Sequence, residues 1–255
     1  MKQLNVKLSG SQKLYVFPIS DLHVGSTYCN YDYIDYLIDK INELKSQVVI
    51  YLLGDLIECG SLKVGNSAFC SDSTVDEQLD FVINTFKPLK RYVRFSCIGN
   101  HEARLYKDYH FDVNKIISKK LRCGCGSQFI DNIKINGKDF KFYGRHGSGS
   151  SKYLHTAFGK IIRDTQHIDA DVFMEGHNHY CGHISIPIMS SEGYKRKDYV
   201  YSGHFLKYGN SYADYMTLPA SPESFIRLDV NKDLVVNSKT FHIDKECPYL
   251  VEIGV

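Results

Sequence analysis

Side chains that bind metal ions follow several short apolar runs in this sequence. The runs are rich in branched residues and bounded by glycine or polar residues, as is typical of strands buried in an α/β sheet. First-row divalent cations take carboxylates, imidazoles and amide oxygens as ligands in hydrolytic sites. The sequence therefore predicts a centre for two divalent metal ions. The candidate residues are Asp21, His23, Asp55, Asn100, His101, His146, His177 and His179.

The spacing of these residues favours convergence on one place. In open α/β sheets the loops that leave the carboxyl ends of the strands form the ligand crevice, so Asp55 would stand at its mouth. Asp21 and His23 are two residues apart, as are His177 and His179, and alternate side chains of an extended chain point the same way. Taken singly, each residue has an ordinary explanation as a cap, a turn or a loop histidine. Because ligand-type residues follow several strands of the same chain, a shared metal site is favoured over separate local roles.

The hydrophobic pattern alternates between strands and amphipathic helices, which indicates the α/β class. We expect helices to begin after Asn30, Ser73 and Asp112 and near Ser151, because apolar residues recur behind each at helical spacing. Beyond residue 180 the helical period disappears and alternating apolar residues predict strands. The expected strands cover residues 14–19, 48–53, 92–98, 129–135, 140–143, 171–174, 225–230 and 234–243, with turns at Asn136-Gly137, at Asn231–Asp233 and at Cys123-Gly-Cys125.

Length and composition set the broad class. We expect one domain over residues 1–255, with a motif-bearing α/β part at about 14–179 and a β-rich part at about 180–255. A formal net charge of +2 is too balanced to indicate nucleic-acid or membrane binding by charge alone. No signal peptide and no run long enough to span a bilayer is visible. The 8 cysteines lack disulfide or zinc spacing, which favours reduced thiols in the cytoplasm.

The motifs in series resemble those of the calcineurin-like metallophosphoesterase superfamily. They are Asp-x-His at 21–23, Gly-Asp at 54–55, Gly-Asn-His-Glu at 99–102, Gly-x-His at 144–146 and Gly-His-x-His at 176–179. Motifs in this order are specific for the superfamily, although not for a substrate. The resemblance implies a four-layer αββα sandwich, in which two mixed β-sheets lie face to face with helices outside. It also implies hydrolysis of phosphate esters at a binuclear metal centre.

The resemblance implies a role for each motif residue. Asp55 would bridge the two ions, and a hydroxide between them would attack phosphorus in line. His101 would face the phosphate, either as general acid for the leaving oxygen or as a hydrogen-bond donor to the developing charge. Manganese is the favoured metal, and iron, zinc, nickel and cobalt also suit these ligands. The ligands would be Asp21, His23 and His179 for one ion, and Asn100, His146 and His177 for the other.

The sequence departs from the branch of this superfamily that acts on phosphoserine and phosphothreonine in proteins. That branch continues Gly-Asp as Gly-Asp-x-x-Asp-Arg-Gly, whereas here Glu58 and Cys59 occupy the places of the last Asp and Arg. Ile98 replaces the arginine before Gly-Asn-His-Glu. Two phosphate-clamping arginines are therefore missing, which argues against a protein phosphatase. Glu58 either orients His101 or is a solvated acid at a helix start. Two other arginines either replace the clamp or lie on the surface: Arg104 and Arg145.

We expect a phosphodiesterase that acts on nucleotides or nucleic acid, as a nuclease does, by analogy with compact members of the superfamily. The alternatives are a phosphomonoesterase on small molecules and a non-catalytic metal-binding scaffold, and the filled motif positions argue against the scaffold. An irregular stretch is expected from Ser191 to Pro222. Its tyrosines and basic residues either clamp nucleotides or pack the stretch onto the second sheet.

Two smaller features stay open at this point. The segment Gly147–Lys152 either presents backbone N–H groups to a phosphate or only positions His146. Among the other histidines, His155 and His204 stand out because they lie near glycine-rich loops. The oligomeric state and the physiological substrate are not specified by the sequence.

Overall fold

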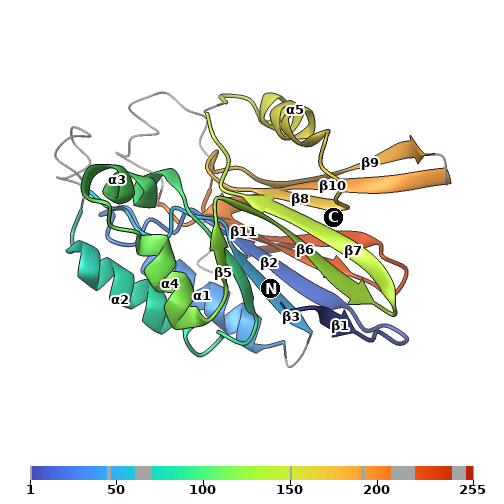
Figure 1. Ribbon diagram of the computed structural model, residues 1–255, viewed down its shortest axis with the longest axis horizontal. Helices are drawn as coiled ribbons and strands as arrows, with labels where there is room; N and C mark the ends of the chain where they lie inside the picture. Colours follow the sequence, from blue (N-terminus) through green and yellow to red (C-terminus); the bar gives the residue numbers. More distant parts are fainter. Residues whose placement is uncertain are drawn as a thin grey trace.

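The computed structural model describes residues 2–44, 47–60, 71–149, 151–190, 193–207, 222–242 and 251–254. Its strands form two mixed sheets that lie face to face, with helices on the outer sides (Figure 1). The predicted α/β class is confirmed, and the hydrophobic clusters described below agree with the predicted αββα order of layers.

The first sheet is built around parallel strands. β2, β3, β4 and β5 lie side by side in this order, and β11 joins β2 in the antiparallel direction. All five residues of β3 are buried, because this strand has a neighbour on each side and is covered on both faces. β12 and β13 extend the sheet beyond β11. The bounds are β2 Leu14–Ile19, β3 Val48–Leu52, β4 Val93–Cys97, β5 Gly124–Gly126, β11 Ser224–Val230, β12 Val236–His242 and β13 Val251–Gly254.

The second sheet has the order β1, β6, β7, β8, β10, with β9 paired to β10. β6 and β7 form the predicted hairpin, and both turn residues, Asn136 and Gly137, have the positive φ that such a tight turn requires. β10 also pairs with β11 through Gly203 and His204, so it joins the two sheets. The bounds are β1 Leu4–Val6, β6 Gln128–Ile135, β7 Lys138–Arg145, β8 Val172–Glu175, β9 Cys181–Ser190 and β10 Gly193–His204.

Three hydrophobic clusters give the order of the layers. One lies between the sheets and includes Tyr51 of β3 and Phe142 of β7. A second joins α1, α2 and α4 to the outer face of the first sheet, and a third joins α5 to the outer face of the second sheet. None of the helices in the described part of the chain is long and apolar enough to cross a bilayer. The bounds are α1 Tyr31–Asn42, α2 Val75–Phe86, α3 Asn100–Tyr109, α4 Val113–Leu121 and α5 Leu154–Thr165.

The capping residues explain where most helices begin. Asn30 and Asp112 accept backbone hydrogen bonds at the starts of α1 and α4, as the sequence predicts. α2 is capped by Thr74, whose side chain forms a capping box with Glu77. The sequence gives no indication of α3, because Glu102 is its only buried side chain and no apolar stripe marks it.

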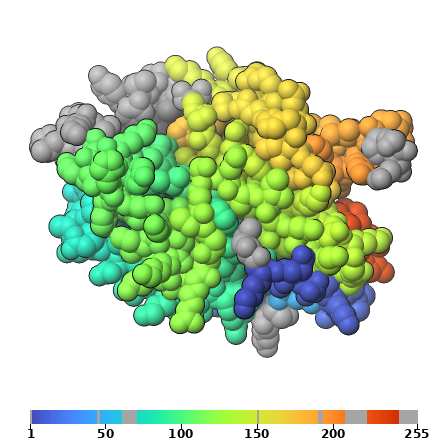
Figure 2. Space-filling view, in the orientation of Figure 1, coloured from blue at the N-terminus to red at the C-terminus, as the bar shows by residue number. Residues whose placement is uncertain are grey.

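The prediction of an irregular stretch from 191 to 222 is wrong for residues 193–204, which form β10. The outer half of this strand pairs with β9 alone and is exposed, so its polar residues show no strand period. The β9–β10 hairpin projects beyond the body of the molecule (Figures 1 and 2). The inner half is buried beneath α5 and includes Tyr199 and Tyr201. Similarly, the turn predicted at Cys123-Gly-Cys125 is replaced by the short edge strand β5.

Candidate metal centre

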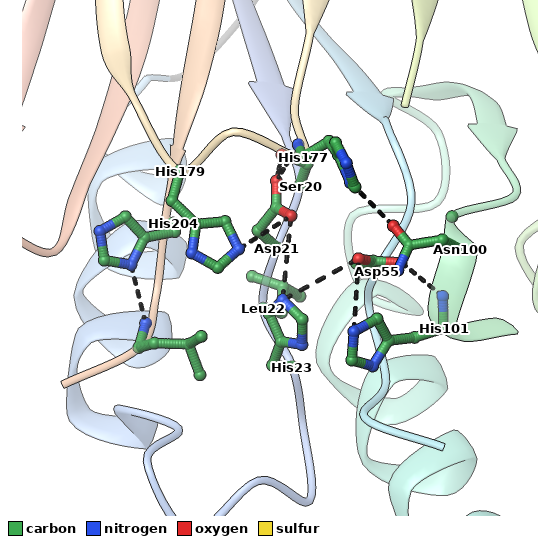
Figure 3. A network of polar contacts seen from close by, with 12 residues as sticks. Ser20, Asp21, Leu22, His23, Asp55, Asn100, His101, His177, His179 and His204 are labelled. Carbon is green, nitrogen blue, oxygen red and sulfur yellow. Dashed lines mark hydrogen bonds and ion pairs between the residues drawn. The ribbon is translucent and has the colours of Figure 1, made fainter. Parts of the chain in front are cut away.

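The predicted ligands lie just after the carboxyl ends of five strands, at one edge of the sandwich. Because the carboxyl ends of these strands meet there, residues far apart in the sequence lie together (Figure 3). The first sheet contributes through loops after β2, β3 and β4, and the second through loops after β7 and β8. In chain order the candidate ligands are Asp21 and His23 after β2, Asp55 after β3, Asn100 after β4, His146 after β7, and His177 and His179 after β8.

Asp21, His23 and His179 form the first group of candidate ligands, with one donor atom of each within 4.8 Å of the others. Oδ1 of Asp21 lies 3.4 Å from Nε2 of His179 and 3.8 Å from Nε2 of His23. The other oxygen accepts hydrogen bonds from the backbone N–H of His177, at 2.9 Å, and from the Ser20 hydroxyl. Asp21 is therefore held by the protein through one oxygen and faces the imidazoles with the other.

Asn100, His146 and His177 form the second group. Oδ1 of Asn100 lies 2.9 Å from Nε2 of His146 and 2.8 Å from Nδ1 of His177, and these two nitrogens are 3.2 Å apart. Nδ1 of His146 donates to the backbone carbonyl of Leu53 at 2.9 Å. That contact fixes the ring so that Nε2 is the atom presented to the group.

Asp55 lies between the two groups. Its Oδ2 atom is 3.1 Å from Nε2 of His146 in the second group and 4.0 Å from Nε2 of His23 in the first. Its Oδ1 atom accepts a hydrogen bond of 2.8 Å from the backbone N–H of His101. One carboxylate oxygen thus faces both groups, which is the arrangement expected of a ligand shared by two cations.

The candidate ligands converge because of a left-handed backbone and not because of strand alternation. Positive φ angles occur at Asp21 (54°), His23 (47°), Asp55 (49°), His177 (67°) and His179 (58°), all beyond the ends of their strands. This conformation costs on the order of 1–3 kcal/mol for each residue with a side chain, and such residues cluster at functional sites. The expectation that alternate residues of an extended chain would aim these side chains is therefore wrong.

Glu102 fastens the loop that carries Asp55. It is 1 % exposed, and its Oε2 accepts hydrogen bonds from the backbone N–H groups of Asp55 and Gly99 at 3.0 and 2.9 Å. Its Oε1 accepts from Leu56 and Ile57 at 2.6 and 3.2 Å. Burial raises the pKa of Glu102 to about 7, yet every one of these contacts is a donor aimed at an oxygen, which fits the carboxylate form. Sequence reasoning did not assign this residue a role, and its place in Gly-Asn-His-Glu was the available signal.

The centre is buried and attracts positive charge. Burial alone would raise the pKa of Asp21 and of Asp55, but nearby histidines hold the pKa of each carboxyl well below its usual range. Burial opposes protonation of His23 and His146. Glu58 nevertheless raises the pKa of His23 to about 9, and Asp55 raises the pKa of His146 to about 9.

Oδ1 of Asp21 and Nε2 of His23 are buried without a hydrogen-bond partner among the described residues. Buried donor atoms in a site that draws positive charge fit a pair of divalent cations.

His101 lies beside Asp55, with its Nε2 atom 3.8 Å from Oδ2 of that carboxylate. Its Nδ1 atom is 2.7 Å from the backbone carbonyl of Glu58 and 3.5 Å from the Glu58 carboxylate. The carboxylate itself bonds to Nδ1 of His23 at 2.8 Å. The predicted contact between Glu58 and His101 is thus made chiefly by the main chain.

The two candidate substrate arginines have different surroundings. The half-buried Arg104 lies against His101, with its two terminal nitrogens 3.2 Å from the two ring nitrogens. Arg145 pairs with Glu175, which is fully buried, and with Asp164 at 3.2 Å. The structure therefore brings Arg104 to the centre and places the Arg145 guanidinium in an ion-pair network with α5.

His204, one of the two other histidines singled out in the sequence, is a neighbour of the centre. Its ring stacks on that of His179, with centroids 5.0 Å apart and an angle of 22°, and the residue is 4 % exposed (Figure 3). Its Nδ1 accepts a hydrogen bond of 3.2 Å from the backbone N–H of Leu206. Ser202, on the same strand, lies 2.6 Å from Ser20, hydroxyl to hydroxyl. β10 thus backs the first ligand group, which could not be foreseen while residues 193–204 were expected to be irregular.

Several tyrosines of the predicted 191–222 stretch are core residues. Tyr199 and Tyr201 are 2 % and 0 % exposed and pack in the cluster beneath α5, which agrees with the packing alternative. Tyr194 is 78 % exposed at the outer end of the hairpin. The remaining tyrosines of that prediction lie outside the described residues: Tyr208, Tyr212 and Tyr215.

Comparisons with known proteins agree with this fold. A profile of the calcineurin-like phosphoesterase family matches residues 16–212, and the chain belongs to that family. Membership supports a phosphoric ester hydrolase and leaves the type of ester open. Comparison with curated proteins gave no sequence match.

Solved structures show the same fold at low sequence identity. A single mutant of Vps29 from Entamoeba histolytica has a TM-score of 0.51 at 13% identity, covering 94% of this chain and 99% of that chain. A double mutant of the same protein has a TM-score of 0.51 at 15% identity, with coverage of 94% and 99%. At these identities the likeness establishes the fold alone.

Proposed function

We propose that this protein is a two-metal-dependent phosphodiesterase that hydrolyses nucleotides or nucleic acids. The observation that carries the proposal is the position of Asp55, whose Oδ2 atom faces His146 at 3.1 Å and His23 at 4.0 Å. A carboxylate that faces two ligand groups at once is suited to hold two cations close together. Family membership supports the hydrolysis of phosphoric esters. Nucleotides and nucleic acids are proposed by analogy with compact members of the superfamily.

The two ligand groups and Asp55 would hold the ions. Divalent cations supply Lewis acidity toward phosphoryl oxygens and activate water at neutral pH. We propose manganese, with iron, zinc, nickel or cobalt as alternatives, because nitrogen and oxygen ligands select weakly among these metals. The proposed ligands are Asp21, His23 and His179 for one ion, Asn100, His146 and His177 for the other, and Asp55 for both.

We assign the role of proton donor to His101. Its Nδ1 faces the Glu58 carbonyl at 2.7 Å, and a carbonyl only accepts, so Nδ1 carries a hydrogen. Nε2 is left to face the centre, 3.8 Å from Oδ2 of Asp55. Burial and the charge of His23 lower the pKa of His101 to about 4. The free ring is therefore neutral at pH 7, and Nε2 would have to take up a proton when the negatively charged substrate binds before it could donate that proton to a leaving oxygen.

The surroundings of the two arginines support a diester in preference to a monoester. A phosphate monoester carries nearly two negative charges at neutral pH, whereas a diester carries one. The charge of Arg145 is already matched by Glu175 and Asp164. Arg104 remains beside His101. Arg104, together with the two cations, would therefore balance the single negative charge of a diester.

A substrate panel tests the proposal. Purified protein with Mn²⁺ is expected to hydrolyse bis(4-nitrophenyl) phosphate faster than 4-nitrophenyl phosphate, and to act on single-stranded DNA, RNA or cyclic nucleotides. A faster monoester reaction would instead identify a phosphomonoesterase. Fewer than two bound ions together with no turnover under any divalent cation would identify a non-catalytic scaffold.

We also propose a single domain in a reducing compartment such as the cytoplasm. The cysteines in the described part of the chain are all free, which supports reduced thiols. β10 bonds to strands of both sheets, which supports folding of the sheets as one unit.

A further inference from the structure

Glu58 contacts two histidines of the centre through two different parts of the same residue. Its carboxylate oxygen Oε2 lies 2.8 Å from Nδ1 of His23. Its backbone carbonyl lies 2.7 Å from Nδ1 of His101. The two rings meet edge to face, with centroids 4.5 Å apart. Glu58 is 7 % exposed, so both contacts are largely shielded from water.

Both contacts dictate which ring nitrogen faces the centre. A carboxylate and a carbonyl only accept hydrogen bonds, so Nδ1 must carry the hydrogen in each ring. Nε2 of His23 is then directed toward Asp21 and Asp55, at 3.8 and 4.0 Å from their oxygens. Nε2 of His101 is directed toward Asp55 at 3.8 Å.

The backbone on each side of Glu58 is fixed. Its N–H donates to the carbonyl of Val24 at 2.9 Å. The next residue, Cys59, has a positive φ of 50°, and its N–H donates at 3.1 Å to the side chain of Gln78. Gln78 is buried and fills the space over Gly25, where an added Cβ would lie 2.3 Å from the Gln78 side chain. The carbonyl of residue 58 is therefore held independently of the Glu58 side chain.

We propose that Glu58 is a positioning residue for both histidines: its side chain orients the metal ligand His23, and its main chain orients the proton donor His101. The inference rests on the proposed metal-dependent function and adds separate roles for the side chain and the main chain of one residue. Mutation can separate these two roles, because substitution of the side chain leaves the carbonyl in place. Partners of this kind behind a ligating histidine are worth about 10–100-fold in metal affinity.

The test measures binding of Mn²⁺ to the full chain by calorimetric titration. Glu58→Ala is expected to weaken the affinity about 10–100-fold. Glu58→Gln keeps an oxygen that can accept from His23 and is expected to recover most of the affinity. Asp198→Asn is a matched control, because Asp198 is a buried carboxylate that contacts a histidine outside the centre, His183, at the same distance of 2.8 Å. Its Mn²⁺ affinity is expected to equal that of the wild type.

A second readout separates the two halves of the proposal. Nitrogen-detected NMR of the histidine rings in the Zn²⁺-loaded protein is expected to show hydrogen on Nδ1 of His101 in the wild type and equally in Glu58→Ala. Unchanged Mn²⁺ affinity in Glu58→Ala would overturn the side-chain half. Loss of the Nδ1 hydrogen of His101 in that variant would overturn the main-chain half. An equal loss of affinity in Asp198→Asn would show that the effect is one of general stability and would also overturn the proposal.

These measurements do not depend on turnover. A wild-type protein that binds two ions but hydrolyses no ester would refute the proposed function while leaving the affinity and NMR comparisons of Glu58 intact. A wild-type protein that hydrolyses diesters while Glu58→Ala binds Mn²⁺ normally would refute the inference about Glu58 and leave the proposed function standing.

Discussion

Oδ2 of Asp55 lies 3.1 Å from Nε2 of His146, although the two residues leave strands of different sheets. Asp55 follows β3 of the first sheet and His146 follows β7 of the second. Nδ1 of His146 reaches back to the carbonyl of Leu53, the residue after β3, at 2.9 Å. The proposed centre is therefore formed by the docking of the sheets, and neither sheet contains it alone.

Replacement of Asp55 by asparagine is expected to remove binding at the shared position. Asn has the shape of Asp but no charge, so it is a poor ligand between two cations. We expect the number of tightly bound Mn²⁺ ions to fall below two and diester hydrolysis to drop by at least about 100-fold, since even partners behind the ligands are worth 10–100-fold. Metal analysis after gel filtration and a rate assay measure this. Asp139→Asn, at an exposed position, is the control, and near-normal turnover in Asp55→Asn would contradict the shared-ligand role.

His101→Ala is expected to separate catalysis from metal binding. Loss of a general acid costs about 10²–10⁴-fold in rate, whereas the ligand groups do not include the His101 ring in the proposed assignment. We expect a rate loss of this size with the Mn²⁺ stoichiometry unchanged. The loss should shrink for a diester with a good leaving group such as 4-nitrophenolate, which needs little protonation. Equal losses for good and poor leaving groups would favour a hydrogen-bond donor to the phosphate over a general acid.

Arg104→Ala and Arg145→Ala are expected to have different kinds of effect. Arg104 lies against His101, and removal of a charged hydrogen-bond donor of 1.5–3 kcal/mol corresponds to a loss of about 10–100-fold in kcat/KM. Arg145→Ala leaves the fully buried Glu175 without its ion-pair partner, which costs about 3–5 kcal/mol of stability. Urea unfolding and steady-state kinetics on both variants distinguish the two. A kinetic defect in Arg145→Ala without loss of stability would support the clamp role predicted for Arg145.

The sequence was sufficient to predict the strands that carry the candidate ligands, because each has apolar residues in a continuous run or in alternation and is followed by a polar tip. It could not predict how those tips are aimed. The left-handed φ of Asp21 and His177 depends on contacts between loops, such as the bond from the backbone N–H of His177 to Asp21 at 2.9 Å. These two residues are 156 positions apart, so the sequence around either one does not indicate the contact between them.

Gly54→Ala is expected to disrupt the centre through a close approach of two loops. Gly54 has φ of 94°, and an added Cβ would lie 2.5 Å from the backbone nitrogen of Gly99. Gly137, with φ of 84° and no atom within 4 Å of an added Cβ, is the matched control. Gly137→Ala should cost about 1–2 kcal/mol, for the left-handed backbone alone. Gly54→Ala should cost about 1–3 kcal/mol more, for the overlap. Urea unfolding compares them, and equal costs would show that the loops can separate.

Glu102→Gln is expected to destabilise the loop that carries Asp55. The amide would place an N–H₂ group where an oxygen now accepts two backbone N–H groups, and each buried donor left unsatisfied costs about 1–3 kcal/mol. Glu77 is the matched control, because it also stands at the third position of a helix but is exposed. We expect Glu77→Gln to cost less than about 1 kcal/mol. Comparable losses in the two variants, measured by thermal unfolding, would contradict the bracing role of Glu102.

The hydrophobic pattern of the sequence did not predict two elements, α3 and β10. α3 begins inside the Gly-Asn-His-Glu motif and buries only Glu102, so it has no apolar stripe to recognise. β10 is polar where it forms the exposed hairpin and apolar only where it enters the sheet, so no single period describes it. In both cases the element is specified by tertiary contacts and not by local preference.

β11 pairs with β10 and with β2, so the edge of β2 stays unpaired until β11 has been synthesised. Every predicted ligand has been translated once His179 is complete, but β2 gains its second neighbour only with Ser224–Val230. At 5–20 residues per second the ribosome needs roughly 3–10 s to cover that interval. During this time β2, which is followed by Asp21 and His23, has an edge that is open to pairing with other chains. The strand that closes this edge is therefore made after every predicted ligand of the centre.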